Sequence, residues 1–252
     1  MAASDTMAFG VEPDRRAFRL RLARYVAAAE TVRDFIAEDR SATSDRPVRI
    51  LDVGVGSGRL MRYVDPDDRL DNIEWTGVDR CPDRLRSVFG AERWHLRIAD
   101  VEQGLAYPDQ SFHIVFCEQV LEHVADPVAV VRDIARVLAP DGIAILGVPI
   151  FPPAVSWTRK AWVGFERSRL NRTRSHRHTF TSRTLREMSE AAGLISQTVR
   201  GFRVLSGGLL SFLENYRWWY QSQRWIGDRL PALCTEAQVV ARKGHDVYAE
   251  VS

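Results

Sequence analysis

Lysine is nearly missing from this chain of 252 residues, because only Lys160 and Lys243 stand among its 35 basic residues and the rest are arginine. The 33 acidic residues leave a formal net charge of only +2. We interpret the excess of arginine over lysine as a bias of genome composition toward arginine codons. The arginines therefore give little support to a nucleic-acid-binding function, which is typical of strongly basic domains.

Cysteine is scarce too, and Cys81, Cys117 and Cys234 lie far apart without a C-x-x-C pair. This spacing argues against a disulfide framework and a zinc site, and it fits a reducing cytoplasm. The longest uncharged apolar run, residues 143–158, contains three prolines and is too short to span a bilayer. No apolar signal core precedes the charged residues 14–16, so we expect a cytoplasmic protein.

Short β-rich runs alternate with helical segments over much of the chain. Apolar spacing predicts a helix over residues 14–40, and Asp126-Pro127 is a typical start for another, which ends at residues 140–142. Repeated strand–helix units predict a mainly parallel sheet with helices on both faces and ligands at the carboxyl ends of the strands. The strand-like runs are 48–53, 74–78, 94–99, 112–117, 143–148, 195–202 and 237–242.

The most informative segment is residues 50–60, where an apolar strand ends at Asp52 and glycines follow at alternate positions. Glycine at this density lets the backbone turn sharply and lets a ligand lie against the main chain. A dinucleotide-binding fold requires glycine at the sixth position of its motif, and counted from Gly54 that position is Arg59. The spacing therefore disfavours a nicotinamide dehydrogenase. It leaves another nucleotide-type ligand, or a purely structural tight turn.

Polar residues follow the next three predicted strands. Asp79 ends the second strand, where a carboxylate can accept both hydroxyls of a ribose. Asp100-Val101 follows the third strand, and Glu118-Gln119 follows the fourth. Asp79 or Asp100 alone is equally typical of a loop N-cap. Because parallel strands bring their carboxyl ends to one edge of a sheet, the residues together with the glycine loop predict a single nucleotide-type site.

Five blocks resemble class I S-adenosylmethionine-dependent methyltransferases, most closely the small-molecule and quinone-biosynthesis type. The blocks are ILDVGVGSG at 50–58, TGVD at 76–79, IADV at 98–101, FHIV with VLEHV within 112–124, and LAPDG at 138–142. The resemblance implies a Rossmann-like α/β fold with a mainly parallel seven-stranded sheet, helices on both faces and an antiparallel last strand. One departure is His113, where the family usually has an aspartate of structural role.

The resemblance also implies S-adenosylmethionine as the methyl donor, and no metal. It implies that the glycine loop cradles the methionine part and the ribose, with Asp52 beneath the loop. By the same resemblance Asp79 holds the ribose diol, Asp100 and Val101 flank the adenine, and Glu118 and Gln119 lie near the sulfonium. The whole set implied for the cofactor is Asp52, Gly54, Gly56, Gly58, Asp79, Arg80, Asp100, Val101, Glu118 and Gln119.

We expect one methyltransferase domain over residues 1–252, with no internal repeat and no long linker. Its expected parts are an N-terminal helix at 14–40, a cofactor-binding core at 48–150, an acceptor-side region at 151–235 with an inserted aromatic helix, and a terminal strand region at 236–252.

Methyl transfer mainly requires that a nucleophile be held in line with the sulfonium methyl, and a hydroxyl acceptor also needs a base. The candidate bases are His123 in the VLEHV block and His176 in a loop before a helix, followed by His178 and Glu118. A structural interpretation stands beside each histidine, as packing at a helix start for His123 and as loop hydrogen bonding for His176.

Two features of the second half bear on the acceptor. Residues 159–186 hold nine basic residues and one acid, which fits a surface for an anionic acceptor or a membrane, or a solvated helix. The aromatic segment 209–230 fits an interfacial helix, an apolar wall over the acceptor, core packing or a dimer contact. We expect a small-molecule, lipid-linked or glycolipid acceptor, and we leave peripheral membrane contact and a homodimer open.

Two other functions stay open. A non-catalytic S-adenosylmethionine-binding subunit or regulator would keep the same glycine loop. Methylation of nucleic acid is disfavoured, because the block after the fourth strand reads CEQV at 117–120 rather than the Asn/Asp-Pro-Pro-Tyr type.

Overall fold

The computed structural model describes residues 18–41, 46–65, 67, 70, 72–150, 177–204 and 208–244. Its centre is a seven-stranded sheet with the strand order β3-β2-β1-β4-β5-β7-β6. Strands β1 to β5 pair in parallel, whereas β7 is antiparallel to both β5 and β6, which confirms the predicted sheet. The strands are β1 Val48–Val53, β2 Ile73–Asp79, β3 Trp94–Ile98, β4 Phe112–Glu118, β5 Leu138–Pro149, β6 Leu194–Phe202 and β7 Glu236–Lys243.

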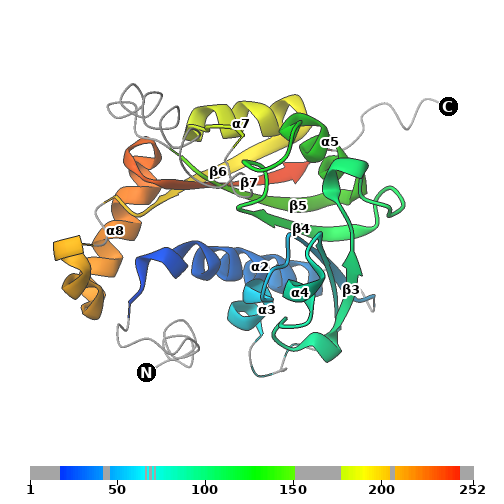
Figure 1. Cartoon of the computed structure of the whole chain (residues 1–252), viewed down its shortest axis with the longest axis horizontal. Helices are drawn as coiled ribbons and strands as arrows, with labels where there is room; N and C mark the ends of the chain where they lie inside the picture. The colour runs from blue at the N-terminus through cyan, green and yellow to red at the C-terminus, as the bar shows by residue number, and fades with distance from the viewer. Residues whose placement is uncertain are drawn as a thin grey trace.

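Helices cover both faces of this sheet, with α2, α3 and α4 on one face and α5 and α7 on the other (Figure 1). The helices are α2 Ala23–Ser41, α3 Arg59–Val64, α4 Pro82–Leu85, α5 Pro127–Val137, α7 Ser182–Ala191 and α8 Arg217–Arg229. Short 3₁₀ turns add η1 Leu20–Leu22, η2 Ala91–Arg93, η3 Val101–Gln103, η5 Gly208–Asn215 and η6 Pro231–Leu233.

The two cores follow from the alternation of side chains along each strand. In β1, Leu51 faces the core beneath α5 and α7, whereas Ile50 faces the core beneath α2 and α3. Both residues are fully buried, so both faces of the central strands must be apolar. The predicted start of α5 is confirmed, because the Asp126 carboxylate accepts a hydrogen bond from the Ala129 N–H at 3.0 Å.

The structure differs from the sequence prediction around residues 138–142. The predicted turn lies within β5, which begins at Leu138 directly after α5. The pairing register with β4 shifts between Phe112 and Ile114, and Asp141 has a φ of 60°. The turn is thus an irregularity at the start of a long strand rather than a separate loop.

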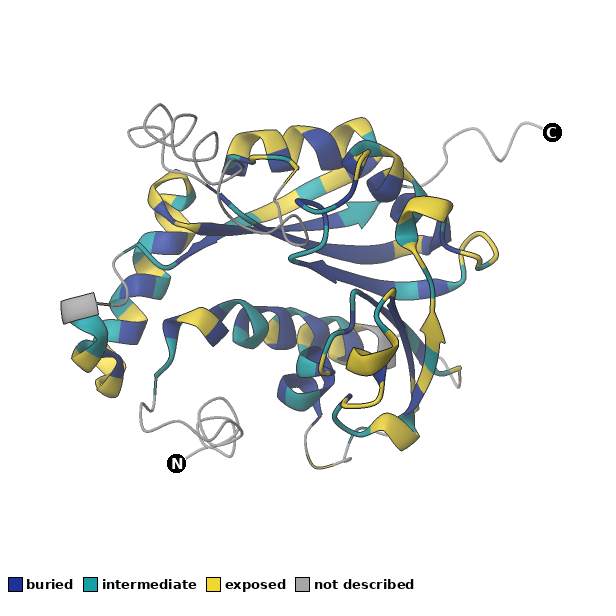
Figure 2. Ribbon diagram, in the orientation of Figure 1, coloured by how far each residue is buried: buried dark blue, intermediate teal, exposed yellow. Residues whose placement is uncertain are grey.

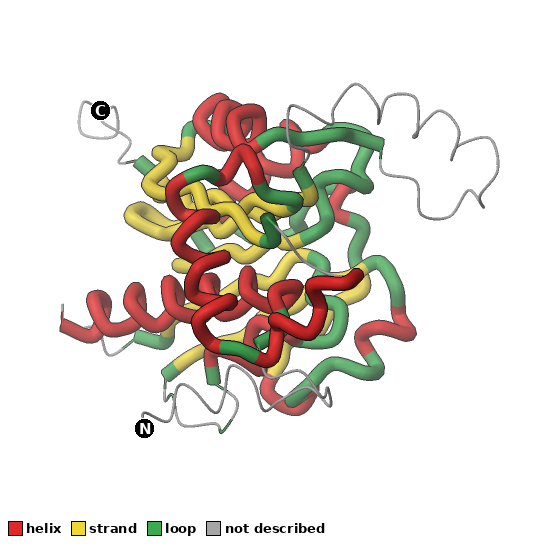
Figure 3. The backbone as a smooth tube through the Cα atoms, turned by 90° about the vertical axis from the view of Figure 1, so that its left-hand side faces the viewer, coloured by secondary structure: helices red, strands yellow, loops and turns green. Residues whose placement is uncertain are grey.

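The predicted aromatic helix also differs in the structure. It is divided into η5 and α8 at Tyr216, whose backbone is extended with φ −115° and ψ 128°. Figure 3 looks onto the end of the molecule where these two helices lie. None of the helices in the described ranges is long and apolar enough to cross a membrane.

Candidate functional site

The loop between β1 and α3 has the left-handed backbone that only glycine adopts freely. Gly54, Gly56 and Gly58 have φ values of 76°, 54° and 70°. A Cβ at Gly54 would lie 2.4 Å from Cγ2 of Val120, and one at Gly58 would lie 2.8 Å from Cγ1 of Val88. The loop therefore needs glycine at both ends, because a side chain there would collide with its neighbours.

Asp79 connects this loop to the end of β2. Its carboxylate accepts hydrogen bonds from the Gly56 N–H at 3.2 Å and from the Cys81 N–H at 2.9 Å. Its side chain is almost fully buried. The structure thus brings Asp79 and the glycine loop together, as the sequence predicted.

Three buried acids lie on the same face of the sheet, which is the α2–α3 face. Asp52 is two residues from Ile50 on β1, and Glu118 is two residues from Phe116 on β4, so each shares its neighbour's face. Asp79 lies on that face as well, because Gly77 pairs with Asp52 across the two strands and Asp79 is two residues after Gly77 on β2. Three carboxyl groups therefore converge at this edge of the sheet, where a cationic ligand would favour their ionised forms.

Asp52 has the most unusual environment of the three. Its carboxylate has no hydrogen bond or ion pair within the described residues, although the residue is only 2% exposed. Burial raises the pKa of Asp52 well above its ordinary value, and the nearby charges of Asp79 and Glu118 raise it further. A buried carboxylate without a partner is costly, and an ammonium or sulfonium group supplied by a ligand would offset that cost.

Glu118 is held by its neighbours rather than open to a ligand. Its carboxylate contacts Nε of Arg24 at 3.2 Å and accepts a hydrogen bond from Nε2 of Gln238 at 3.0 Å. Arg24 also reaches Glu236 at 2.8 Å, and Glu236 reaches Arg203 at 2.8 Å. Burial raises the pKa of Glu118 to about 7, against the opposing effect of Arg24. This chain of charges, which we name the Arg24 network, joins α2 to β4 and β7.

Gln119 follows Glu118 with a left-handed backbone, at a φ of 58°. Its N–H donates to the carbonyl of Gly147 at 2.9 Å, which turns the chain away at the end of β4. Its side-chain Nε2 is buried without a hydrogen-bond partner among the described residues. This donor lies beside the Glu118 carboxylate, and it is a second group at the carboxyl edge that a bound ligand could contact.

The residues expected around the adenine lie at the end of β3 and are more exposed. The Asp100 carboxylate caps η3 by accepting a hydrogen bond from the Glu102 N–H at 3.0 Å. This contact matches the N-cap role that the sequence offered as the alternative to adenine binding. Val101 packs against the core beneath α5, and Arg80 is exposed.

Ile98 was missed by the sequence reasoning. It pairs in register with Asp79 and is 61% exposed, so it presents apolar surface beside that carboxylate. The sequence feature that could have identified Ile98 is its place at the end of a predicted strand, just before the block assigned to the adenine.

The candidate bases separate by their contacts. Nε2 of His123 lies 3.8 Å from Oε1 of Glu122, and the His123 side chain is 35% exposed. Nε2 of His178 lies 3.0 Å from the carbonyl oxygen of Ala125, which agrees with loop hydrogen bonding. His176 lies outside the described residues, as does most of the basic segment 159–186.

Glu122 is a buried acid that the sequence reasoning passed over. Its side chain is 1% exposed, and its Oε2 atom is buried without a hydrogen-bond partner among the described residues. Burial raises the pKa of Glu122 to about 7, and the charge of Glu118 raises it as well. The neighbouring Glu and His of the VLEHV block could have pointed to Glu122 as a candidate site residue.

His113, the departure from the family pattern, has a structural contact. Its Nδ1 accepts a hydrogen bond from the backbone N–H of Arg49 at 3.0 Å, which ties the start of β4 to β1. An imidazole can therefore make a backbone contact of the kind that a carboxylate would make at this position.

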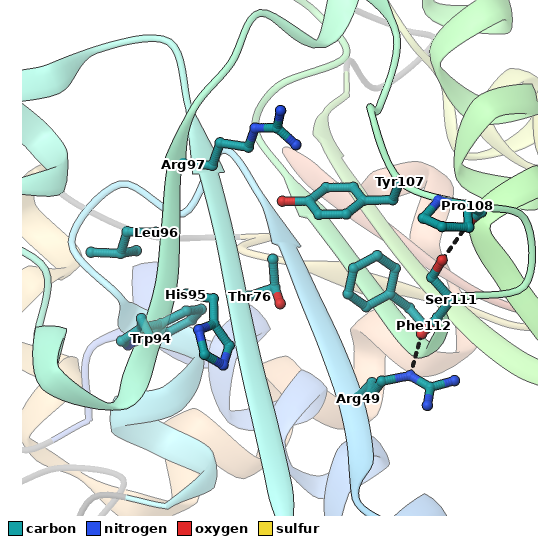
Figure 4. A pocket seen from close by; sticks show the side chains of 10 residues that line it. All are labelled: Arg49, Thr76, Trp94, His95, Leu96, Arg97, Tyr107, Pro108, Ser111 and Phe112. Carbon is teal, nitrogen blue, oxygen red and sulfur yellow. Dashed lines mark hydrogen bonds between the residues drawn. The ribbon is translucent and has the colours of Figure 1, made fainter.

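An open hollow of about 860 Å³ lies elsewhere, beside β2 and β3 (Figure 4). Thr76 lines it, and Thr76 alternates with Trp75 and Gly77, so the hollow is on the face opposite Asp79. The chain crosses from β3 to β4 with only η3 and no longer helix, which leaves this part of the sheet uncovered. The hollow is therefore separate from the glycine loop and its acids. Its lining residues are Arg49, Thr76, Trp94, His95, Leu96, Arg97, Tyr107, Pro108, Ser111 and Phe112.

Metal binding has no support in the described part of the chain. Among those residues no group of three or more His, Cys, Asp or Glu side chains is arranged to hold a metal ion.

Comparisons with known proteins agree with this geometry. A family model described as a methyltransferase domain matches residues 21–196. The chain is 32% identical over 155 residues to a malonyl-[acyl-carrier protein] O-methyltransferase of Halorhodospira halophila, covering 59% of this chain and 51% of that protein. It is 35% identical over 111 residues to a ubiquinone biosynthesis O-methyltransferase of Xanthomonas campestris pv. campestris, covering 42% and 45%. The chain thus spans about half the length of the curated relatives it matches.

A solved structure extends the likeness in fold over nearly the whole chain. It is that of a putative sarcosine dimethylglycine methyltransferase from Galdieria sulphuraria, with a TM-score of 0.59 and 14% identity. The match covers 96% of this chain and 99% of the other.

Proposed function

This chain belongs to the methyltransferase-domain family, and we propose that it transfers a methyl group from S-adenosylmethionine to a small-molecule or lipid-linked acceptor. The single observation that carries the proposal is the buried, partnerless Asp52 carboxylate at the carboxyl end of β1, beside a glycine loop and Asp79. A nucleoside that carries positive charge satisfies all three features. A nicotinamide dinucleotide could also use Asp79 for its ribose, but its anionic pyrophosphate is disfavoured beside the Asp52 carboxyl, and Arg59 stands where its motif requires glycine.

We assign the cofactor contacts as follows. Asp52 faces the positive charge of the methionine part, Asp79 accepts the ribose hydroxyls, and Ile98 offers apolar surface to the adenine. The glycine loop lets the cofactor lie close to the main chain, and Gln119 offers its Nε2 donor. When bound, S-adenosylmethionine supplies an electrophilic methyl group.

The acceptor proposal follows the relatives. Two of them are named as O-methyltransferases, one acting on malonyl-[acyl-carrier protein] and one in ubiquinone biosynthesis. Oxygen is therefore the acceptor atom that we propose for this chain. A hydroxyl acceptor loses a proton on methylation, so a base beside it contributes to the rate.

We assign that base to His123. Oε1 of Glu122 lies 3.8 Å from Nε2 of His123, so a carboxylate beside the imidazole can stabilise the imidazolium that forms when His123 takes the proton. His176 stays a second candidate, and its position lies outside the described residues.

The cofactor assignment is tested by calorimetry with two ligands. We expect S-adenosylhomocysteine to bind and NADH to give no binding heat, because Asp52 favours an ammonium group over a pyrophosphate and Arg59 replaces the glycine that a dinucleotide requires. Binding of NADH alone would contradict the proposed methyl donor. Binding of S-adenosylhomocysteine without turnover on any screened hydroxyl acceptor would favour the non-catalytic subunit instead.

The base assignment is tested with His123→Asn. We expect kcat to fall about 100-fold, which is within the usual contribution of a general base, while the affinity for S-adenosylhomocysteine stays unchanged. His178→Asn is the matched control, because His178 already bonds to the carbonyl of Ala125. Normal turnover of His123→Asn on a hydroxyl acceptor would remove His123 from the reaction.

A further inference from the structure

The described residues concentrate their exposed apolar surface in one segment. Of the eight large apolar side chains that stand out as exposed, only Ile98 and Ile195 lie outside residues 212–233. The other six are between 48% and 58% exposed, and we name them the aromatic ridge. The ridge consists of Phe212, Tyr216, Trp218, Trp225, Leu230 and Leu233. It lies on η5, α8 and η6 at one end of the molecule (Figure 2).

The two faces of α8 explain why the ridge points outward. Trp218 and Trp225 are seven residues apart, which is close to two full turns, so both side chains lie on one face. The opposite face carries the buried residues Tyr220, Gln223 and Gly227. The helix therefore already has an inner face packed on the protein, and the indoles are left on the outer face.

Contacts on the inner face hold α8 firmly. A Cβ at Gly227 would lie 1.9 Å from the carbonyl oxygen of Gly201, so α8 packs backbone to backbone on β6. The Gln223 side chain accepts a hydrogen bond from the Val204 N–H at 3.1 Å, and Arg224 pairs with Glu30 of α2 at 2.8 Å. Rotation of α8 would break these contacts, so the ridge cannot cover itself by turning inward.

The charges around the ridge are mainly positive. The guanidinium of Arg229 lies 4.3 Å from the ring centre of Trp225, and Arg217 is exposed immediately before Trp218. Asp228 is the exposed acid of the segment, whereas Glu214 is buried. Tryptophan, tyrosine and arginine together are typical of surfaces at the level of lipid headgroups, where rings meet acyl chains and guanidinium groups meet phosphates.

The size of the ridge is at the lower limit of what a stable protein partner needs. Six side chains that are each about half exposed offer on the order of 600 Å². A stable protein interface needs about 800 Å² from each partner. A bilayer has no such requirement, because affinity there grows with each inserted side chain.

We propose that the aromatic ridge docks this protein on an anionic lipid bilayer. The ridge arises from the connection between the end of β6 and the start of β7, where Glu236 pairs with Pro149 at the carboxyl edge of the sheet. The glycine loop opens at the same edge, so docking brings the methyl-transfer site next to the membrane surface. The inference rests on the proposed lipid-linked acceptor, which would be reached from the bilayer.

Flotation with vesicles tests the docking surface. The full chain is mixed at low salt with two kinds of vesicle. One contains phosphatidylcholine alone, and the other also contains about 30% phosphatidylglycerol, which makes its surface anionic. We expect binding to the anionic vesicles, weakened at high salt. Trp218→Ser with Trp225→Ser should lower the partition coefficient by at least about tenfold. Ile195→Ser is the matched control, because Ile195 is 60% exposed outside the ridge and should leave binding unchanged.

The positive charges are tested separately. Arg217→Gln and Arg229→Gln should each lower binding to anionic vesicles by about fivefold and leave any binding to phosphatidylcholine unchanged. Absence of wild-type binding to anionic vesicles at low salt overturns the proposal, as does an equal loss in Ile195→Ser. A wild-type dimer that becomes monomeric in the double tryptophan variant also overturns it, because the ridge is then a contact between two copies.

Calorimetry with S-adenosylhomocysteine distinguishes this proposal from the proposed function. Its affinity should be unchanged in the double tryptophan variant, which also shows that the variant is folded. If the protein binds S-adenosylhomocysteine but no vesicles, only the proposed docking surface is contradicted. Vesicle binding without any affinity for S-adenosylhomocysteine removes the methyl donor and leaves the docking surface standing.

Discussion

Asp79→Ala is expected to weaken the binding of S-adenosylhomocysteine by about 100-fold. A carboxylate that accepts two ribose hydroxyls contributes about 1.5 kcal/mol or more for each charge-assisted hydrogen bond, and about 3 kcal/mol corresponds to about 100-fold in affinity. The substitution also removes the acceptor for the Gly56 N–H, so the glycine loop loses its connection to β2. Calorimetry on the purified variant measures the change.

Asp83→Ala is the matched control for this experiment. Asp83 lies in α4, four residues after Asp79, and its exposed side chain pairs with Arg86 at 3.0 Å. Surface substitutions of this kind change stability by less than about 0.5 kcal/mol, and we expect no change in affinity. An Asp79→Ala variant that binds S-adenosylhomocysteine as tightly as the wild type would remove Asp79 from the site.

Arg24→Met is expected to lower the free energy of unfolding by about 3–5 kcal/mol. Methionine fills much of the same volume, but it leaves the buried carboxylates of Glu118 and Glu236 without their shared guanidinium. A buried charge that loses its partner costs far more than an exposed one. Urea unfolding at pH 8 measures the loss, and Arg21→Met, on the exposed turn just before α2, is the control with an expected change below about 0.5 kcal/mol.

The pH dependence of this variant has a definite sign. The pKa of Glu118 in the folded protein is raised from its ordinary value of 4.5 to about 7. An acid whose pKa is raised by folding contributes stability that is fully present below about pH 4.5 and is lost as the pH rises through about 7. Arg24 lowers the pKa of Glu118. Removal of its guanidinium therefore raises that pKa further and increases the stability that is lost as the pH rises. The deficit of Arg24→Met should therefore be largest above pH 7 and shrink toward pH 5. A deficit independent of pH would show that packing, rather than charge, holds α2 to the sheet.

The sequence predicted the class of the protein well, and the match of residues 21–196 to a methyltransferase domain confirms it. The mainly parallel seven-stranded sheet and its antiparallel last strand are also confirmed. The roles of the cofactor-binding residues stay predictions, although the glycine loop and Asp79 do lie together. The role of His176 stays a prediction as well.

Other features were beyond the sequence. Glu118 was expected near the sulfonium end, and that placement stays a prediction, but the sequence did not indicate that its carboxylate contacts Arg24 and Gln238. The partners within this network lie as many as 212 positions apart in the chain, as for Arg24 and Glu236. Sequence spacing carries no information about a contact between residues so distant.

By itself, the sequence determined the features that depend on neighbouring residues. Alternate glycines require a left-handed turn, an aspartate before a proline starts a helix, and short apolar, β-rich runs form strands. Only the tertiary structure decided which buried groups remain without partners and which faces remain uncovered. The isolation of Asp52, the engagement of Glu118 and the outward face of α8 all result from packing between distant elements. Burial and pairing depend on every neighbour in space, so the same carboxylate or indole can be a ligand contact, a structural ion pair or a docking surface until the fold selects one.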